Sequence, residues 1–103
     1  MKTIFGKAAQ SDIDLLWEHC VVEFGEAQAD VLLDRIYGTV KETIGVFPEC
    51  GRLRPEFGSG VRLFPILLYT LFYRVGRRRV SVLRILHGRR DLKGPLMSLM
   101  LSA

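Results

Sequence analysis

Apolar residues recur at helical spacing through the first half of this 103-residue chain. The first stretch comprises Ile13, Leu16, Trp17, Cys20, Val21 and Phe24, and the second comprises Ala29, Leu32, Leu33, Ile36, Val40, Ile44 and Phe47. This spacing predicts two amphipathic helices. We expect the first to begin after Ser11, with Asp12 and Asp14 in its first turn. Gly25 separates the two and Pro48 ends the second, which predicts a helical hairpin with these core residues: Trp17, Phe24, Leu33 and Ile36.

The remaining segments are typical of strands. A short strand is predicted at 2–5, and 49–60 is a loop by its glycines and proline. Three further strands are predicted: Val61–Phe64, stopped by Pro65, then Leu67–Val75 and Val80–His87, with a solvated basic turn at 76–79. The order β-α-α-β-β-β predicts an α+β fold in which a helical hairpin packs on a small antiparallel sheet. We expect residues 1–103 to form a single domain.

The charges divide the chain into an acidic and a basic half. Residues 1–51 carry four basic and nine acidic side chains, a net charge of −5, whereas residues 52–103 carry eleven basic and two acidic ones, a net charge of +9. Such a chain suits a negatively charged partner: nucleic acid, a protein that handles nucleic acid, or an acidic protein. The hydrophobic content of 49% is high for a small domain and predicts apolar surface that a partner covers.

Several classes of site and location are not expected. No apolar run reaches the ~18 residues that span a bilayer, and the first residues lack a secretory signal, so we expect no membrane and a cytoplasmic location. Cys20 and Cys50 are then expected to be reduced thiols. Phosphate-binding glycine motifs, metal-ligand spacings and catalytic triads do not occur, so neither a cofactor nor a metal is implied.

Basic residues interrupt and follow the last two predicted strands. Arg74 and Arg84 stand among apolar neighbours, where an arginine needs a carboxylate such as Glu56 or Asp91. His87 is of a residue type suited to acid–base chemistry near neutral pH, but we favour a structural histidine bonded to the backbone. Three residues form a basic exit from the sheet: Arg89, Arg90 and Lys93.

Five short motifs accompany this order of elements. They are D-x-x-x-x-W (Asp12 and Trp17), G-R-x-R-P-E (Gly51–Glu56), F-P (Phe64 and Pro65), Y-x-x-F-Y-R-V (Tyr69–Val75) and L-R-I-L-H-G-R-R-D (Leu83–Asp91). In combination, over about residues 3–92, the chain resembles the ParE toxins of the ParE/RelE superfamily of type II toxin–antitoxin modules.

The resemblance implies a small toxin, of the kind associated with plasmid stabilisation, that poisons DNA gyrase by binding and not by catalysis. It implies neutralisation by a cognate ParD-like antitoxin, with nucleic acid contacted only indirectly. The candidate residues for binding target or antitoxin are the basic ones: Arg74, Arg84, His87, Arg89, Arg90 and Lys93.

Two alternatives remain open. The first is a RelE-like ribosome-dependent mRNA endonuclease, whose candidate catalytic residues are Arg62, Arg74, His87 and Arg90. Thr70 stands where such cleavers hold an arginine, and residues 92–103 lack their tyrosine or histidine. The second is an attenuated, antitoxin-binding relative, because Leu67 and Leu68 replace the usual glycine and polar residue. A leucine fits poorly in a turn that needs positive φ, so a remodelled turn and extra exposed apolar surface are expected.

Overall fold

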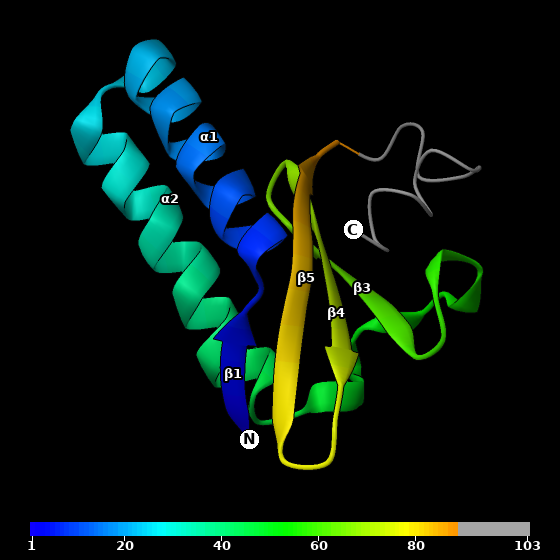
Figure 1. Cartoon of the computed structure of the whole chain (residues 1–103). Helices are drawn as coiled ribbons and strands as arrows, with labels where there is room; N and C mark the ends of the chain where they lie inside the picture. Colours follow the sequence, from blue (N-terminus) through cyan, green and yellow to red (C-terminus); the bar gives the residue numbers. More distant parts are fainter. Residues whose placement is uncertain (89–103) are drawn as a thin grey trace.

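The structure, a computed structural model, describes residues 1–88 and has two helices packed on a five-stranded sheet (Figure 1). The helices are α1 (Lys7–Phe24) and α2 (Glu26–Thr39), which a π-helical turn, Val40–Ile44, continues. The strands are β1 (Lys2–Phe5), β2 (Arg52–Leu53), β3 (Val61–Ile66), β4 (Tyr69–Val75) and β5 (Arg79–His87). Short 3-10 turns occupy Pro48–Cys50 and Pro55–Phe57. The predicted α+β fold with a helical hairpin is confirmed.

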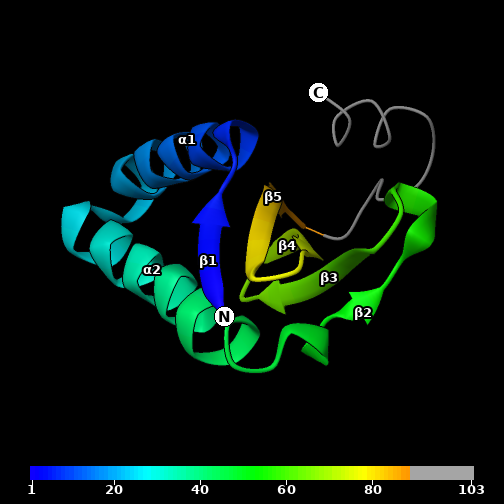
Figure 2. The ribbon, with the colours of Figure 1, turned by 60° about the horizontal axis from the view of Figure 1, so that its bottom comes forward.

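The sheet differs from the prediction in two respects. Its order is β1-β5-β4-β3-β2, and β1 pairs with β5 in parallel, so the sheet is mixed and not purely antiparallel. The loop predicted at 49–60 contains β2, whose two residues pair with β3. Figure 2 shows α1 and α2 side by side against one face of this curved sheet.

The predicted start of α1 and the predicted end of β3 are wrong. Helix α1 begins at Lys7, with Gly6 as its N-cap, so Asp12 lies in its second turn and is buried. Strand β3 continues through Pro65 to Ile66. A proline is tolerated there because β2 pairs only with Arg62 and Leu63, so within the described part of the chain no strand adjoins that edge of β3 at Pro65.

The main core lies between the helices and the sheet. Its buried residues include Ile13, Leu16, Ile36, Leu71, Tyr73 and Val82. Of the four predicted core residues, Ile36 is fully buried, Leu33 packs against the core and Trp17 is half-buried, but Phe24 is 68% exposed. Phe47 is exposed as well. A second cluster on the other face of the sheet contains Phe57, Val61, Leu63 and Phe72.

A β-bulge in β5 brings the sheet into register with the helices. Phe72 pairs with Arg84 while Tyr73 pairs with Val82, so Leu83 is an extra residue on β5. Side chains alternate between faces along a regular strand, which would put Val82 and Ile85 on opposite faces. The extra residue lets both join the core beneath the helices, while Leu83 packs on the other cluster.

Candidate partner-binding site

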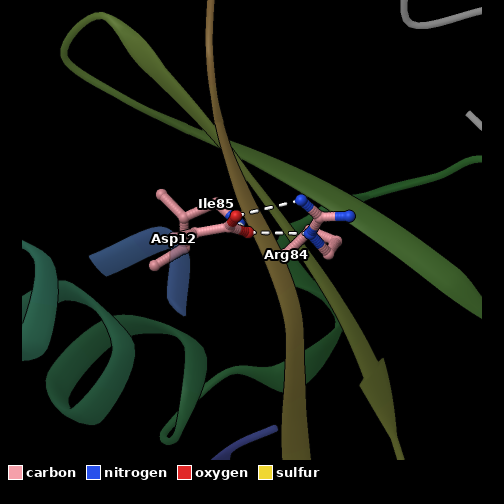
Figure 3. Close-up of polar contacts among 3 residues, drawn as sticks. All are labelled: Asp12, Arg84 and Ile85. Carbon is pink, nitrogen blue, oxygen red and sulfur yellow. Dashed lines mark hydrogen bonds and ion pairs between the residues drawn. The ribbon is translucent and has the colours of Figure 1, made fainter. Parts of the chain in front are cut away.

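An ion pair between α1 and β5 fixes one wall of the candidate site (Figure 3). Arg84 donates from Nε to Asp12 Oδ2 at 2.8 Å and from a terminal nitrogen to Asp12 Oδ1 at 2.9 Å. The backbone N–H of Ile85 donates to the same carboxylate at 3.0 Å. The hydrogen bonds that Arg84 donates to Asp12 raise the pKa of its guanidinium, which stays charged. Asp12 is therefore a carboxylate partner of Arg84 that was not predicted. Of the two predicted partners, Glu56 binds Arg54 at 2.7 Å, and Asp91 lies outside the described residues.

The same carboxylate covers an open edge of the sheet. Strand β1 pairs with β5 only from Arg79 to Val82, so the rest of that edge has no strand beside it within residues 1–88. The Ile85 N–H on this edge is satisfied by Asp12. Because a buried donor without a partner is costly, Asp12 stabilises both the helix–strand contact and the end of β5.

An apolar groove opens between α1, α2 and the β3–β4 turn, with a volume of about 340 Å³. We call it the helix–turn groove. Its lining residues are His19, Cys20, Phe24, Gln28, Val31, Leu32, Arg35, Leu67, Leu68 and Tyr69. Arg35 is its one formally charged lining residue, and the apolar side chains at its rim are largely exposed: Phe24 (68%), Val31 (62%), Leu67 (59%) and Leu68 (70%). Exposed apolar grooves are typical of surfaces that the apolar side chains of a partner cover.

A second hollow adjoins the groove along α1 and the end of β5. It has a volume of about 420 Å³, and its lining residues are Asp12, Leu15, Leu16, His19, Tyr69, Ile85, Leu86 and His87. His19 and Tyr69 line both hollows, so the two form one continuous surface. Burial, and to a smaller extent the neighbouring Cys20, raises the pKa of Tyr69, whose phenol stays neutral.

The β3–β4 turn forms one lip of the groove and is built from two leucines. Ile66 pairs with Tyr69, which leaves Leu67 and Leu68 as the whole connection. Leu67 has φ of 56°, in the left-handed region that normally favours glycine. The predicted strand start at Leu67 is wrong, and the expected exposed apolar surface at this turn is confirmed. The turn is tied to the end of β5, because the Gly88 N–H donates to the Leu68 carbonyl at 2.7 Å.

The basic residues singled out from the sequence that lie within residues 1–88 are not gathered at one place. Arg74 Nε donates to the Ser59 carbonyl at 2.8 Å, and Arg62 donates to the Gly51 carbonyl at 2.9 Å. His87 is exposed and packs edge-on against Tyr69, with ring centroids 5.3 Å apart. Within residues 1–88, that ring contact holds the His87 side chain, and a side-chain hydrogen bond to the backbone does not. Arg89, Arg90 and Lys93 lie outside the described residues.

The register of the strands separates His87 from Arg74, two of the candidate residues of the nuclease alternative. His87 lies opposite Tyr69, whereas Arg74 lies five positions further along β4. At ~3.3 Å per residue, roughly 17 Å of strand separates them. Thr70, at the position where cleaving relatives hold an arginine, is buried and donates its hydroxyl to the Gly88 carbonyl at 2.9 Å.

The hydroxyl of Tyr73 closes the opposite end of the core, a role that no sequence pattern indicated. It accepts a hydrogen bond from the Gly51 N–H at 2.8 Å and donates to the Pro48 carbonyl at 2.7 Å. Burial raises the pKa of Tyr73 to about 12, so the phenol stays neutral. Position 51 needs a glycine, because a Cβ there would clash with the Tyr73 oxygen at a distance of 2.5 Å. This network holds the segment that leads into β2.

Within residues 1–88, His, Cys, Asp and Glu side chains do not gather in groups of three that could hold a metal ion. Neither described helix is apolar enough over its length to cross a bilayer.

Comparisons with known proteins all point to one family. Residues 3–92 match the family described as ParE toxin of type II toxin–antitoxin system, parDE. Toxin ParE3 from Caulobacter vibrioides is 30% identical over 95 residues, which cover 92% of this chain and 94% of that protein. The structure entitled Chromosomal ParDE TA system from P. aeruginosa is similar with a TM-score of 0.74 and 25% identity, over 86% of this chain and 97% of that one.

Proposed function

Because this chain belongs to the ParE toxins of type II toxin–antitoxin systems, we propose that it inhibits DNA gyrase and that a ParD-type antitoxin neutralises it. The proposed target would place its action in the cytoplasm. The observation that carries the binding half of this proposal is the helix–turn groove, an exposed apolar surface on a small domain. Such surface is costly in water and is typical of a docking site.

The chemistry of the groove favours an acidic, amphipathic segment of an antitoxin. A helix that lays its apolar face into a groove needs apolar walls, which Phe24, Val31 and Leu68 supply. Arg35 offers a cation to a carboxylate at the edge of such a helix. The similar structure from Pseudomonas aeruginosa is of a ParDE system, which supports a ParD-type partner.

The positions of the candidate catalytic residues favour a binding toxin over a ribonuclease. Cleavage of RNA through its 2′-OH needs a proton-transfer group and phosphate-binding cations within a few ångströms of one another. Arg62 and Arg74 instead bind backbone carbonyls of the 49–60 segment, far along β4 from His87. The net charge of +9 on residues 52–103 supports an acidic or DNA-bound target such as gyrase.

Controlled expression of the chain tests the proposal in cells. Induction should arrest growth, relax plasmid supercoiling and produce double-strand breaks, and co-expression of the antitoxin encoded beside it should suppress all three effects. Growth arrest without any change in supercoiling would contradict the gyrase target. Antitoxin binding without growth arrest would instead support the attenuated relative, which the unusual Leu67–Leu68 turn makes the leading second candidate.

A further inference from the structure

The β3–β4 turn combines backbone strain with exposed apolar side chains. Leu67 is the only non-glycine residue with positive φ among residues 1–88. The side chain of an L-residue is crowded by its own backbone in this region, whereas glycine is not. Glycine, asparagine or aspartate would therefore serve the turn better than leucine.

Burial of the leucine side chains does not compensate for the strained backbone of Leu67. Leu67 is 59% exposed and Leu68 is 70% exposed, so most of their apolar surface faces water. Two adjacent leucines at the tip of a turn thus stabilise neither the backbone nor the core. Local strain that the fold does not require is typical of a functional site.

The surroundings of the turn indicate what covers it. Leu67 and Leu68 face the exposed Phe24 and Val31 across the helix–turn groove. No carboxylate is among the residues that line the groove, and Arg35 and His19 are its basic members. The surface is therefore complementary to an apolar helix face flanked by acidic residues.

We propose that the Leu67–Leu68 turn is the specificity-determining contact by which this toxin distinguishes its own antitoxin from those of related systems. This inference rests on the proposed antitoxin partner and names the residues that select it. The two leucines insert between apolar residues of an acidic amphipathic helix that lies in the groove. An antitoxin shaped for a turn with glycine and a polar residue leaves them partly exposed and binds less tightly.

Two probes and four variants test the inference. The probes are the purified antitoxin encoded beside this chain and the purified ParD of the Pseudomonas aeruginosa system. The variants are Leu67→Asn and Leu67→Gly, which suit positive φ, then Leu68→Ser, and Phe47→Ser as the matched control. Phe47 is 67% exposed and does not line the groove. Kd is measured by titration calorimetry and Tm by circular dichroism.

The expected result is selective. Leu67→Asn and Leu68→Ser should each weaken cognate binding roughly tenfold or more and leave the weaker binding of the Pseudomonas ParD within about threefold. Leu67→Asn and Leu67→Gly should not lower Tm, because both residues relieve the strain, and Phe47→Ser should change neither Kd.

Other outcomes separate the inference from the proposed function. Cognate binding unchanged in the Leu67 and Leu68 variants would overturn the inference while the antitoxin partner stands, as would an equal loss for both antitoxins. Self-association of the unaltered chain that Leu68→Ser abolishes, with unchanged antitoxin affinity, would assign the turn to a second copy and also overturn it. Failure of the unaltered chain to bind either antitoxin would refute the proposed partner and the inference together.

Discussion

Asp12 and Arg84 are 72 residues apart in the chain, yet they form a two-pronged ion pair in which both side chains are largely buried. The pair joins α1 to β5 beside the second hollow, which Asp12 lines. Removing one partner of such a pair weakens the compensation of the other buried charge, which costs far more than an exposed pair contributes.

Asp12→Ala is therefore expected to lower the free energy of unfolding by about 3 kcal/mol. The loss also includes the acceptor of the Ile85 N–H. Asp14→Ala, on the exposed side of the same helix, is the matched control and should change stability by less than about 0.5 kcal/mol. Urea unfolding followed by circular dichroism measures both. Equal effects of the two substitutions would show that the pair does not stabilise the fold.

Tyr73→Phe should remove the hydroxyl that bridges Gly51 and Pro48 and lower the free energy of unfolding by about 1–3 kcal/mol. The pKa of Tyr73 in the folded chain is raised to about 12, above its ordinary value of 10.0. The neutral phenol thus contributes stability that is complete below pH 10.0 and is lost as pH rises through about 12. Unfolding curves from pH 8 to 12 should show a steeper decline in the unaltered chain than in Tyr73→Phe, which keeps only the smaller contribution of Tyr69. Parallel pH profiles would contradict this role of the hydroxyl.

Replacement of Arg89 and Arg90 by alanine should weaken growth arrest while Tm stays within about 2 °C of that of the unaltered chain. Both arginines lie in the basic stretch that the sequence shares with ParE toxins, beyond the described residues. The matched control is the double substitution Arg77→Ala and Arg78→Ala in the exposed β4–β5 turn, which removes the same charge. Equal attenuation by the two pairs would indicate a general charge effect and not a specific contact.

Induction of the chain should produce no new transcript 5′ ends inside codons. Thr70 holds the Gly88 carbonyl and offers no cation to phosphate, and Arg74 lies far along β4 from His87. Mapping of 5′ ends during induction checks this prediction, with His87→Ala as the diagnostic variant. Codon-associated ends that disappear in His87→Ala would establish the ribonuclease alternative.

Local patterns in the sequence predicted the helical hairpin, four of the five strands and the apolar turn, because each depends on neighbouring residues. The partner of Arg84 could not be predicted in this way, since Asp12 reaches it only after the whole chain has folded. Strand β2 was missed because two residues carry no alternation. The start of α1 was missed because Gly6 caps it without a side-chain hydrogen bond.

The site was predicted less completely than the fold. Helical periodicity placed Phe24 in the core, but it lies in the last turn of α1, where the sheet does not reach, and it forms the rim of the groove instead. The unfavourable leucine turn could be recognised from the sequence, because positive φ is a local demand on a single residue. Its place beside α1 and α2 depends on tertiary packing and could not.

A supercoiling assay with purified gyrase is the direct test of the proposed target. The purified chain should inhibit gyrase in a concentration-dependent manner, and a stoichiometric amount of the antitoxin encoded beside it should restore full activity. Unchanged supercoiling at every concentration of a chain that is folded, and that arrests growth in cells, would contradict gyrase as the target.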